Sequence, residues 1–330
     1  METKTILVDK YVNKEETYSQ AVEMLRNGEV VAFPTETVYG LGAIATNAEA
    51  VDKIFKAKGR PADNPLIVHV DSKETAMNYA VNVTQKAEKC MEAFWPGALT
   101  LIMNAKPETF ASNVTAGLDT VGIRVPDHPV ALNLLKRLQL PIAAPSANTS
   151  GKPSPTLAEH VFHDMNEKIP LILDGGATSI GIESTVLDMT CEPPCILRPG
   201  QITKEQIENV IGLVRSSSDI KSNAPKSPGM KYLHYAPEAP VYLIEEDVRL
   251  IEMAIDHLHN EGKKVAVLSH HDFHDADYGF PLTAETLYGS LRKCDMLNVN
   301  LILAAVSKER KNEDAILNRL EKAADHKWFS

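Results

Sequence analysis

Residues 29–70 read EVVAFPTETVYGLGAIATNAEAVDKIFKAKGRPADNPLIVHV. The apolar start is typical of a buried strand, and the polar turn after Phe33 marks its end. Asn47 is placed to cap a helix that ends near Lys58, where Gly59 can adopt the left-handed conformation. Four cations fall on the last turns of this helix or just beyond it: Lys53, Lys56, Lys58 and Arg60. We therefore expect the segment that follows Phe33 to form a phosphate-handling surface rather than a core element.

Length and composition limit the class of protein. The chain has 330 residues, of which 44% are hydrophobic and 24% charged, and its formal net charge is -10. This length exceeds the roughly 150 residues of a typical domain and predicts two domains. Against the acidic background, the local cations form a positive field that suits a compact anion. The absence of an apolar run long enough for a bilayer, and of a secretory signal pattern, predicts a cytoplasmic protein with reduced cysteines.

Short β-rich runs alternate with helical patterns, which is typical of an α/β fold with a mixed sheet. After EVVAF, further strands are expected at residues 66–70, 99–103, 122–125, 142–144, 171–173, 185–188 and 196–198. We expect a first domain over residues 1–214, a linker over 215–240 and a second, smaller α/β domain over 241–330. The loops after the strands of the first domain are where a binding cleft is expected.

These loops offer groups that bind phosphate. The chain has no GxxxxGK[ST] motif, and residues 40–45 fit a dinucleotide fingerprint only loosely. Lys58-x-Arg60 and Ser146-x-Asn148 combine cations with hydroxyl and amide donors that suit a polyphosphate. Each pattern also fits ordinary structure, a solvated helix end for the first and a turn for the second. Without a recognisable nucleophile, the residues favour chemistry by positioning and charge neutralisation, as in phosphoryl or nucleotidyl transfer.

Two arginines are expected at strand ends. Arg124 and Arg198 each close an apolar strand, where an unpaired guanidinium would be costly. We therefore expect one of them to pair with Glu36 or Glu183. His69 alternates with apolar residues along its strand, and a half-buried structural histidine is as good an interpretation as a functional one.

A metal held by the protein is not predicted. The histidines of residues 270–274 lie in an aspartate-rich loop without a matching pair of ligands. Cys191 and Cys195 likewise lack a second pair, and the two prolines between them favour a hairpin over a zinc site.

Seven motifs, in order and across about the first 200 residues, resemble one family. They are PTETVYGLG, KAKGRPADNPLIVHV, FWPGALT, GIRVPDHP, APSANTSGKPSP, GIESTVLD and LRPG. Together they resemble threonylcarbamoyl-AMP synthase, and SPGMKYLHYAP with the α/β tail extends the resemblance to its long, two-domain form. The resemblance implies a YrdC-like twisted mixed-sheet domain with a large central cleft, plus a smaller Rossmann-like C-terminal α/β domain. It also implies a nucleotidyltransferase that makes threonylcarbamoyl-AMP and pyrophosphate from L-threonine, bicarbonate and ATP with Mg²⁺, for N6-threonylcarbamoyladenosine (t6A) modification of tRNA.

The resemblance further implies roles for individual residues. Lys58 and Arg60 would be the catalytic pair. L-threonine would be held by Thr37, His69, Arg124, Ala144 and Ser184. ATP would be held by Lys58, Arg60, Asn64, Thr120, Ser146, Asn148, Ser154, Arg198, His234 and Tyr235. Linker residues Tyr232, His234 and Tyr235 could fold over the cleft as a lid that excludes water.

Two other functions stay open. An RNA-binding, ribosome-associated module would fit a concave positive surface, although the acidic net charge and the small basic patch argue against it. Another carbamoyl-adenylate-forming transferase, as in hydrogenase maturation, would carry acylphosphatase-like and zinc-finger segments that this sequence does not show. As further partners we expect a downstream tRNA threonylcarbamoyl-transfer enzyme complex, weak or no direct binding of tRNA, and no membrane.

Overall fold

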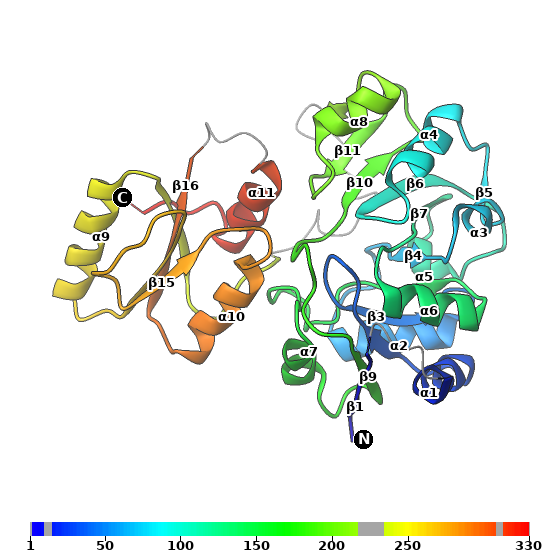
Figure 1. The fold of residues 1–330 in the computed structure, drawn as a ribbon, viewed down its shortest axis with the longest axis horizontal. Coiled ribbons are helices and arrows are strands. Elements are labelled where there is room, and N and C mark those ends of the chain that lie inside the picture. The colour runs from blue at the N-terminus through cyan, green and yellow to red at the C-terminus, as the bar shows by residue number, and fades with distance from the viewer. Residues whose placement is uncertain (1, 10–14, 217–233, 308–312, 330) are drawn as a thin grey trace. The chain divides into compact units, whose positions relative to one another are not determined.

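The computed structural model describes residues 2–9, 15–216, 234–307 and 313–329 (Figure 1). The chain divides into two compact units, each with its own sheet. Unit 1 comprises Met1–Ser150 and Pro155–Lys231, and unit 2 comprises Gly151–Ser154 and Tyr232–Ser330. Most of the predicted linker, including Tyr232 of the predicted lid, lies outside the described residues.

Unit 1 is built on a large mixed sheet, as the sequence predicted. Its strands are β1 (Lys4–Leu7), β2 (Val31–Phe33), β3 (Gly40–Ile44), β4 (Ile67–His69), β5 (Ala80–Val81), β6 (Leu99–Ala105), β7 (Thr120–Arg124), β8 (Ile142–Ala143), β9 (Leu171–Asp174), β10 (Thr185–Asp188), β11 (Cys195–Arg198) and β12 (Arg215–Ser216). They follow the order β1-β9-β2-β3-β8-β4-β7-β6-β10-β11-β12, with β5 paired to β6. The pairs β4–β7 and β6–β10 are parallel, whereas β3–β8 and β6–β7 are antiparallel.

Eight helices are described in unit 1: α1 (Glu15–Arg26), α2 (Ala48–Lys58), α3 (Lys73–Met77), α4 (Gln85–Phe94), α5 (Ser112–Thr115), α6 (Pro129–Leu138), α7 (Ala158–Met165) and α8 (Lys204–Ile211). Apolar residues of α2, α4, α7 and α8 share the main core cluster, and those of α1 and α6 pack with Phe33 in a second cluster. The sheet is therefore covered by apolar helix faces, and its loops at the strand ends are left to carry polar groups.

Local signals placed α2 correctly. The Asn47 side chain accepts a hydrogen bond from Ala50 N, and Gly59 adopts a left-handed φ of 62°. Because Asn47 caps the first turn and the left-handed Gly59 cannot continue the helix, α2 begins at Ala48 and ends at Lys58.

The expectation that the segment after Phe33 forms a surface is wrong for Gly40–Ile44. These five residues form β3, a buried strand that pairs with β2 and β8. A Cβ on Gly42 would lie 2.7 Å from both Phe33 and Ile142 side-chain atoms. The glycine is therefore needed for close packing in the core rather than for contact with phosphate.

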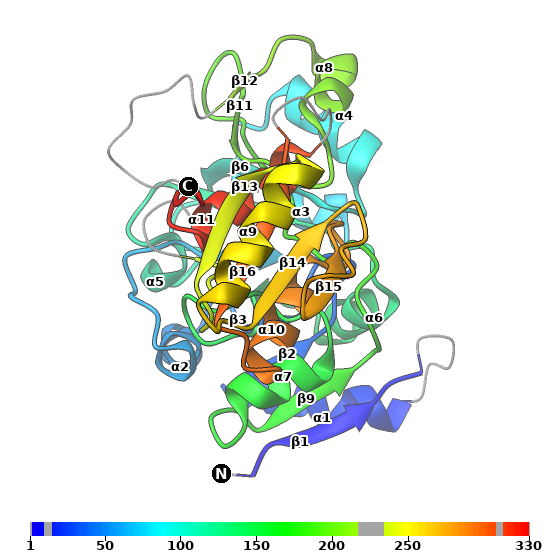
Figure 2. The same ribbon diagram turned by 90° about the vertical axis from the view of Figure 1, so that its left-hand side faces the viewer.

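Unit 2 is a small α/β unit around four parallel strands. The strands β13 (Val241–Glu245), β14 (Val265–Ser269), β15 (Tyr278–Pro281) and β16 (Leu301–Val306) lie in the order β13-β16-β14-β15. The helices are α9 (Val248–Asn260), α10 (Leu287–Met296) and α11 (Asp314–Ala323). Figure 2 shows α9 on one face of this sheet and α10 and α11 on the other. Right-handed crossovers that run in opposite directions across the sheet, through α9 and α10, require this two-sided arrangement.

Among the described residues, no helix is both long and apolar enough to cross a membrane.

Candidate active site

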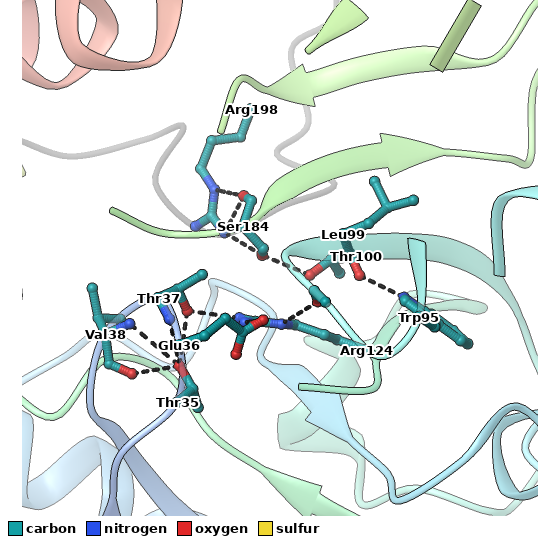
Figure 3. Close-up of polar contacts among 11 residues, drawn as sticks. Thr35, Glu36, Thr37, Val38, Trp95, Leu99, Thr100, Arg124, Ser184 and Arg198 are labelled. Atoms are coloured by element: carbon teal, nitrogen blue, oxygen red, sulfur yellow. Dashed lines mark hydrogen bonds and ion pairs between the residues drawn. The ribbon is translucent and has the colours of Figure 1, made fainter. Parts of the chain in front are cut away.

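Arg124 is a buried charge of unit 1 with several polar contacts. It ends β7, and its side chain is only 4% exposed. Its Nε donates to Gly97 O at 3.1 Å, and its Nη1 donates to Thr37 Oγ1 at 2.9 Å. Its Nη2 lies 2.5 Å from Glu36 Oε1, an ion pair whose angles fall outside hydrogen-bond geometry (Figure 3). The predicted pairing of a strand-end arginine with Glu36 is therefore confirmed.

The PTET turn fixes the groups that face Arg124. Thr35 Oγ1 donates to Val38 O at 2.7 Å, so at its 2.8 Å contact with Thr37 Oγ1 it can only accept. The Thr37 hydroxyl proton is thereby directed to Thr35, and its oxygen is left to accept from Arg124. Backbone bonds from Ile180 N to Glu36 O and from Gly181 N to Thr37 O hold the turn from the other side.

His69 lies beside Arg124 on the neighbouring parallel strand, in direct register. It is buried rather than half-buried, and its ring meets Phe33 edge-on. Burial first, and the Arg124 charge second, lower the pKa of His69 to about 3. The ring is therefore neutral at physiological pH and serves as a hydrogen-bonding group rather than a cation. One residue beyond β8, Ala144 donates its backbone N–H to Ile67 O, so its position is tied to β4.

This shifted pKa predicts an acid-sensitive fold. Unfolded chains protonate His69 near its ordinary pKa of 6.5, whereas the folded protein does so only near 3. Its contribution to stability is therefore complete above pH 6.5 and falls as the pH drops towards 3, by about 2 kcal/mol at pH 5. In His69→Gln this loss should disappear, so the unfolding free energy in urea should change less between pH 7.5 and pH 5 than in the parent. An identical pH dependence in the two proteins would contradict the shift.

Ser184 and Arg198 are joined where β10 and β11 run antiparallel. Arg198 donates to Ser184 O from Nε at 3.1 Å and from Nη2 at 2.9 Å, and Nη2 also lies 3.2 Å from Ser184 Oγ. Ser184 Oγ in turn lies 2.8 Å from Thr100 Oγ1 on β6. Figure 3 shows Ser184 between Arg198 and Thr100, with Arg124 and the PTET turn nearby.

The KxR and SxN patterns meet at Lys58. This residue is 2% exposed, so a solvated helix end is excluded. Its Nζ donates to Ser146 O and Asn148 O at 2.6 Å each, and lies 3.4 Å from Asn148 Oδ1. Arg60 Nη2 donates to Asn64 O at 3.4 Å, and Asn64 is itself buried. Lys58 of the KxR pattern therefore holds the backbone of the SxN loop in place.

Other candidate residues are not placed with this group. Thr120 begins β7, four residues before Arg124, which corresponds to about 13 Å along a strand. Ser154, His234 and Tyr235 belong to unit 2. There Tyr235 is buried, stacks on Tyr288 with ring centroids 5.5 Å apart, and lies under the Arg319 guanidinium. Ser154 ends a segment that Arg292 holds through Pro153 O.

Two contributors were not singled out from the sequence. Thr35 orients Thr37, and Gly97 supplies the carbonyl for Arg124 Nε. A Cβ on Gly97 would lie 2.5 Å from Phe94 O, so only glycine fits there. Both residues stand in motifs that carry the family resemblance, which was the available signal.

No group of three or more His, Cys, Asp or Glu side chains able to hold a metal occurs in the described part of the chain. Cys191 and Cys195 are free thiols, and the segment between them joins β10 to its antiparallel partner β11, as expected for a hairpin.

Comparison with known proteins gives concordant matches. Residues 23–200 match a family model described as telomere recombination, and residues 202–325 match one described as the C-terminal domain of threonylcarbamoyl-AMP synthase. The chain is 48% identical over 340 residues to threonylcarbamoyl-AMP synthase of Bacillus subtilis, covering 98% of each. It is 47% identical over 320 residues to that of Pyrococcus abyssi, covering 93% of this chain and 94% of the other. It superposes on the crystal structure of P. abyssi Sua5 complexed with L-threonine with a TM-score of 0.93, at 44% identity and 99% coverage of each chain.

Proposed function

The chain belongs to the threonylcarbamoyl-AMP synthase family, whose product serves t6A modification of tRNA, and from this premise we propose how its residues carry out the reaction. The reaction joins L-threonine, bicarbonate and ATP into threonylcarbamoyl-AMP and releases pyrophosphate. Since the reaction combines an amino acid with a nucleotide, unit 1 must provide one region for each.

Arg124 binds the carboxylate of L-threonine. Of its five N–H donors, one on Nε and one on Nη1 are used in hydrogen bonds to Gly97 and Thr37. The remaining donors are enough for a bidentate contact with a carboxylate. This buried, partly used guanidinium is the observation on which the proposal chiefly depends. Thr37, neutral His69, Ser184 and the Ala144 backbone complete the pocket, and the threonine complex of the P. abyssi relative supports the assignment.

ATP lies towards Lys58 and the SxN loop. The Lys58 ammonium holds the Ser146 and Asn148 carbonyls, which leaves the Ser146 hydroxyl to orient a phosphate. Arg60, Asn64 and Arg198 add charge and amide donors, as their motifs imply. We keep Thr120, Ser154, His234 and Tyr235 as further nucleotide contacts and the linker as a lid, on the strength of the family motifs alone.

The chemistry needs alignment and charge neutralisation. The threonine amine and bicarbonate give an N-carboxylate and water. One oxygen of this carbamate then attacks the α-phosphate of ATP in line with the leaving pyrophosphate, which makes the mixed anhydride. Lys58 and Arg60 offset the negative charge that accumulates on the phosphates, which is the main catalytic contribution available to such a site.

Mg²⁺ enters as part of the ATP substrate. We propose that substrate phosphates and waters, rather than protein side chains, hold most of the ion, and the described residues contain no group of three His, Cys, Asp or Glu side chains able to ligate it. Magnesium commonly keeps several waters and binds through substrate phosphates, which fits this ligand set. No step proposed here depends on a metal held by the protein.

Family membership also supports four more general proposals. We propose a cleft among the loops of unit 1, a Rossmann-like character for unit 2, a cytoplasmic location and a downstream tRNA threonylcarbamoyl-transfer complex as the recipient. The domain boundaries at 214 and 240 stay predictions.

The test is pyrophosphate release from ATP and Mg²⁺ by the full chain, with L-threonine and bicarbonate each added or withheld. Release should require both, because the attacking oxygen exists only once the carbamate has formed. Substantial release without threonine would mean simple ATP hydrolysis. No release from a folded protein that binds ATP would overturn the proposal.

A further inference from the structure

Glu36 is a buried carboxylate whose capacity to accept hydrogen bonds is not used by the residues around it. It is 5% exposed, and no hydrogen bond within the described residues reaches either of its oxygens. Arg124 Nη2, at 4% residue exposure, also lacks a hydrogen bond there despite its close ion pair with Glu36. Buried polar atoms without hydrogen bonds are costly and rare, and they are often found where a ligand binds.

Other buried carboxylates of unit 1 differ in this respect. Asp164 accepts a hydrogen bond from Thr149 N, and Asp188 accepts two from Thr190. Each is satisfied by its own surroundings. Glu36 instead has an ion pair with Arg124 and no hydrogen bond to its oxygens within the described residues. Its charge also acts on the exposed Asp127, whose pKa is raised by desolvation and then by Glu36.

We propose that Glu36 binds the α-amino group of L-threonine and so selects an amino acid over other hydroxy acids. This inference rests on the proposed binding of the threonine carboxylate to Arg124. In an amino acid a single carbon separates the carboxylate from the amine, and Glu36 touches the same guanidinium that receives the carboxylate. The amine therefore arrives beside the Glu36 oxygens and supplies the N–H donors that they lack.

The charges are consistent with this arrangement. Glu36, Arg124 and the two ends of the ligand form an alternating set of opposite charges, in which each has an oppositely charged neighbour. Because Arg124 already neutralises Glu36, the pair adds little net negative charge that would hold the amine protonated. The carbamate retains one N–H, so the contact with Glu36 persists after bicarbonate has reacted.

A thermodynamic cycle tests this proposal without relying on activity. The probes are L-threonine and (R)-3-hydroxybutyrate, which has the same carboxylate and hydroxyl but no amine. Dissociation constants are measured by ligand-observed NMR titration for the parent and for Glu36→Gln. We expect the parent to bind (R)-3-hydroxybutyrate about tenfold or more weakly than L-threonine, because the amine is missing. In Glu36→Gln the dissociation constant of L-threonine should rise by a similar factor, whereas that of (R)-3-hydroxybutyrate should stay within about threefold of the parent value.

If Glu36→Gln lowers the affinity for both ligands by the same factor, Glu36 acts only through Arg124 and the proposal is overturned. It is also overturned if the affinity for neither ligand falls. Glu36→Asp keeps the charge beside Arg124 and should restore part of the preference for threonine over (R)-3-hydroxybutyrate. This variant provides the test if Glu36→Gln folds poorly. Asp188→Asn is the matched control, with lowered stability but unchanged threonine affinity. A parent protein that binds no threonine at all would instead contradict the proposed function.

Discussion

Replacing Lys58 by methionine should lower the rate of pyrophosphate release roughly 100-fold or more. The ammonium at this position is 2% exposed and donates to Ser146 O and Asn148 O. Methionine preserves the volume of the side chain but removes a charge at the proposed phosphate site and leaves two carbonyls without their donor. Each unsatisfied carbonyl costs about 1–3 kcal/mol, so a lower midpoint of thermal unfolding should accompany the loss of rate.

Lys56→Met is the control for this experiment. Lys56 lies on the last turn of the same helix but is exposed, so its removal changes the net charge equally without disturbing the SxN loop. It should retain the rate and the thermal midpoint of the parent. If Lys56→Met lost as much activity as Lys58→Met, the general positive field of the helix end, rather than the Lys58 contact, would be responsible.

The contrast between these two lysines shows what the sequence could predict. Helix α2 was placed correctly because its limits depend on Asn47 and Gly59, which act within a few residues. The burial of Lys58 depends on carbonyls 88 and 90 residues away, and no local pattern contains that information. The motif resemblance assigns Lys58 and the SxN loop to the same ATP site, but only the fold shows that Lys58 holds this loop through hydrogen bonds to the Ser146 and Asn148 carbonyls.

Small residues caused the main error in the predicted fold. The glycines at positions 40 and 42 favour a loop by local propensity, yet they form β3 in the core. The close approach of Phe33 and Ile142 to Gly42 depends on tertiary packing, which overrides that propensity. Strand β15 has only a weak signal in the sequence for a different reason, since alternate residues of this edge strand are exposed and its sequence contains glycine and proline.

Tyr235 has packing that its motif does not reveal. The nucleotide contact implied by the motif stays a prediction, and within unit 2 the ring stacks on Tyr288 and lies under the Arg319 guanidinium. Spacing along the chain cannot reveal this packing, because its partners lie on α10 and α11, far along the sequence.

Removing the Arg124 side chain should have the largest combined effect on stability and substrate use. Arg124→Met leaves the Glu36 carboxylate buried beside an apolar group, and breaking a buried ion pair in this way costs about 3–5 kcal/mol. The same change removes the proposed anchor for the threonine carboxylate. We therefore expect a large loss of unfolding free energy in urea together with a threonine KM raised at least about 100-fold.

The double variant Arg124→Met/Glu36→Leu separates these two effects. Replacing both members of a buried pair with apolar groups is often neutral for stability, so most of the lost unfolding free energy should return. Threonine use should not return, because neither its carboxylate nor its amine would have a partner. A double variant as unstable as the single one would show that the Glu36 charge is not what destabilises Arg124→Met. A normal threonine KM in either variant would remove Arg124 from the threonine site.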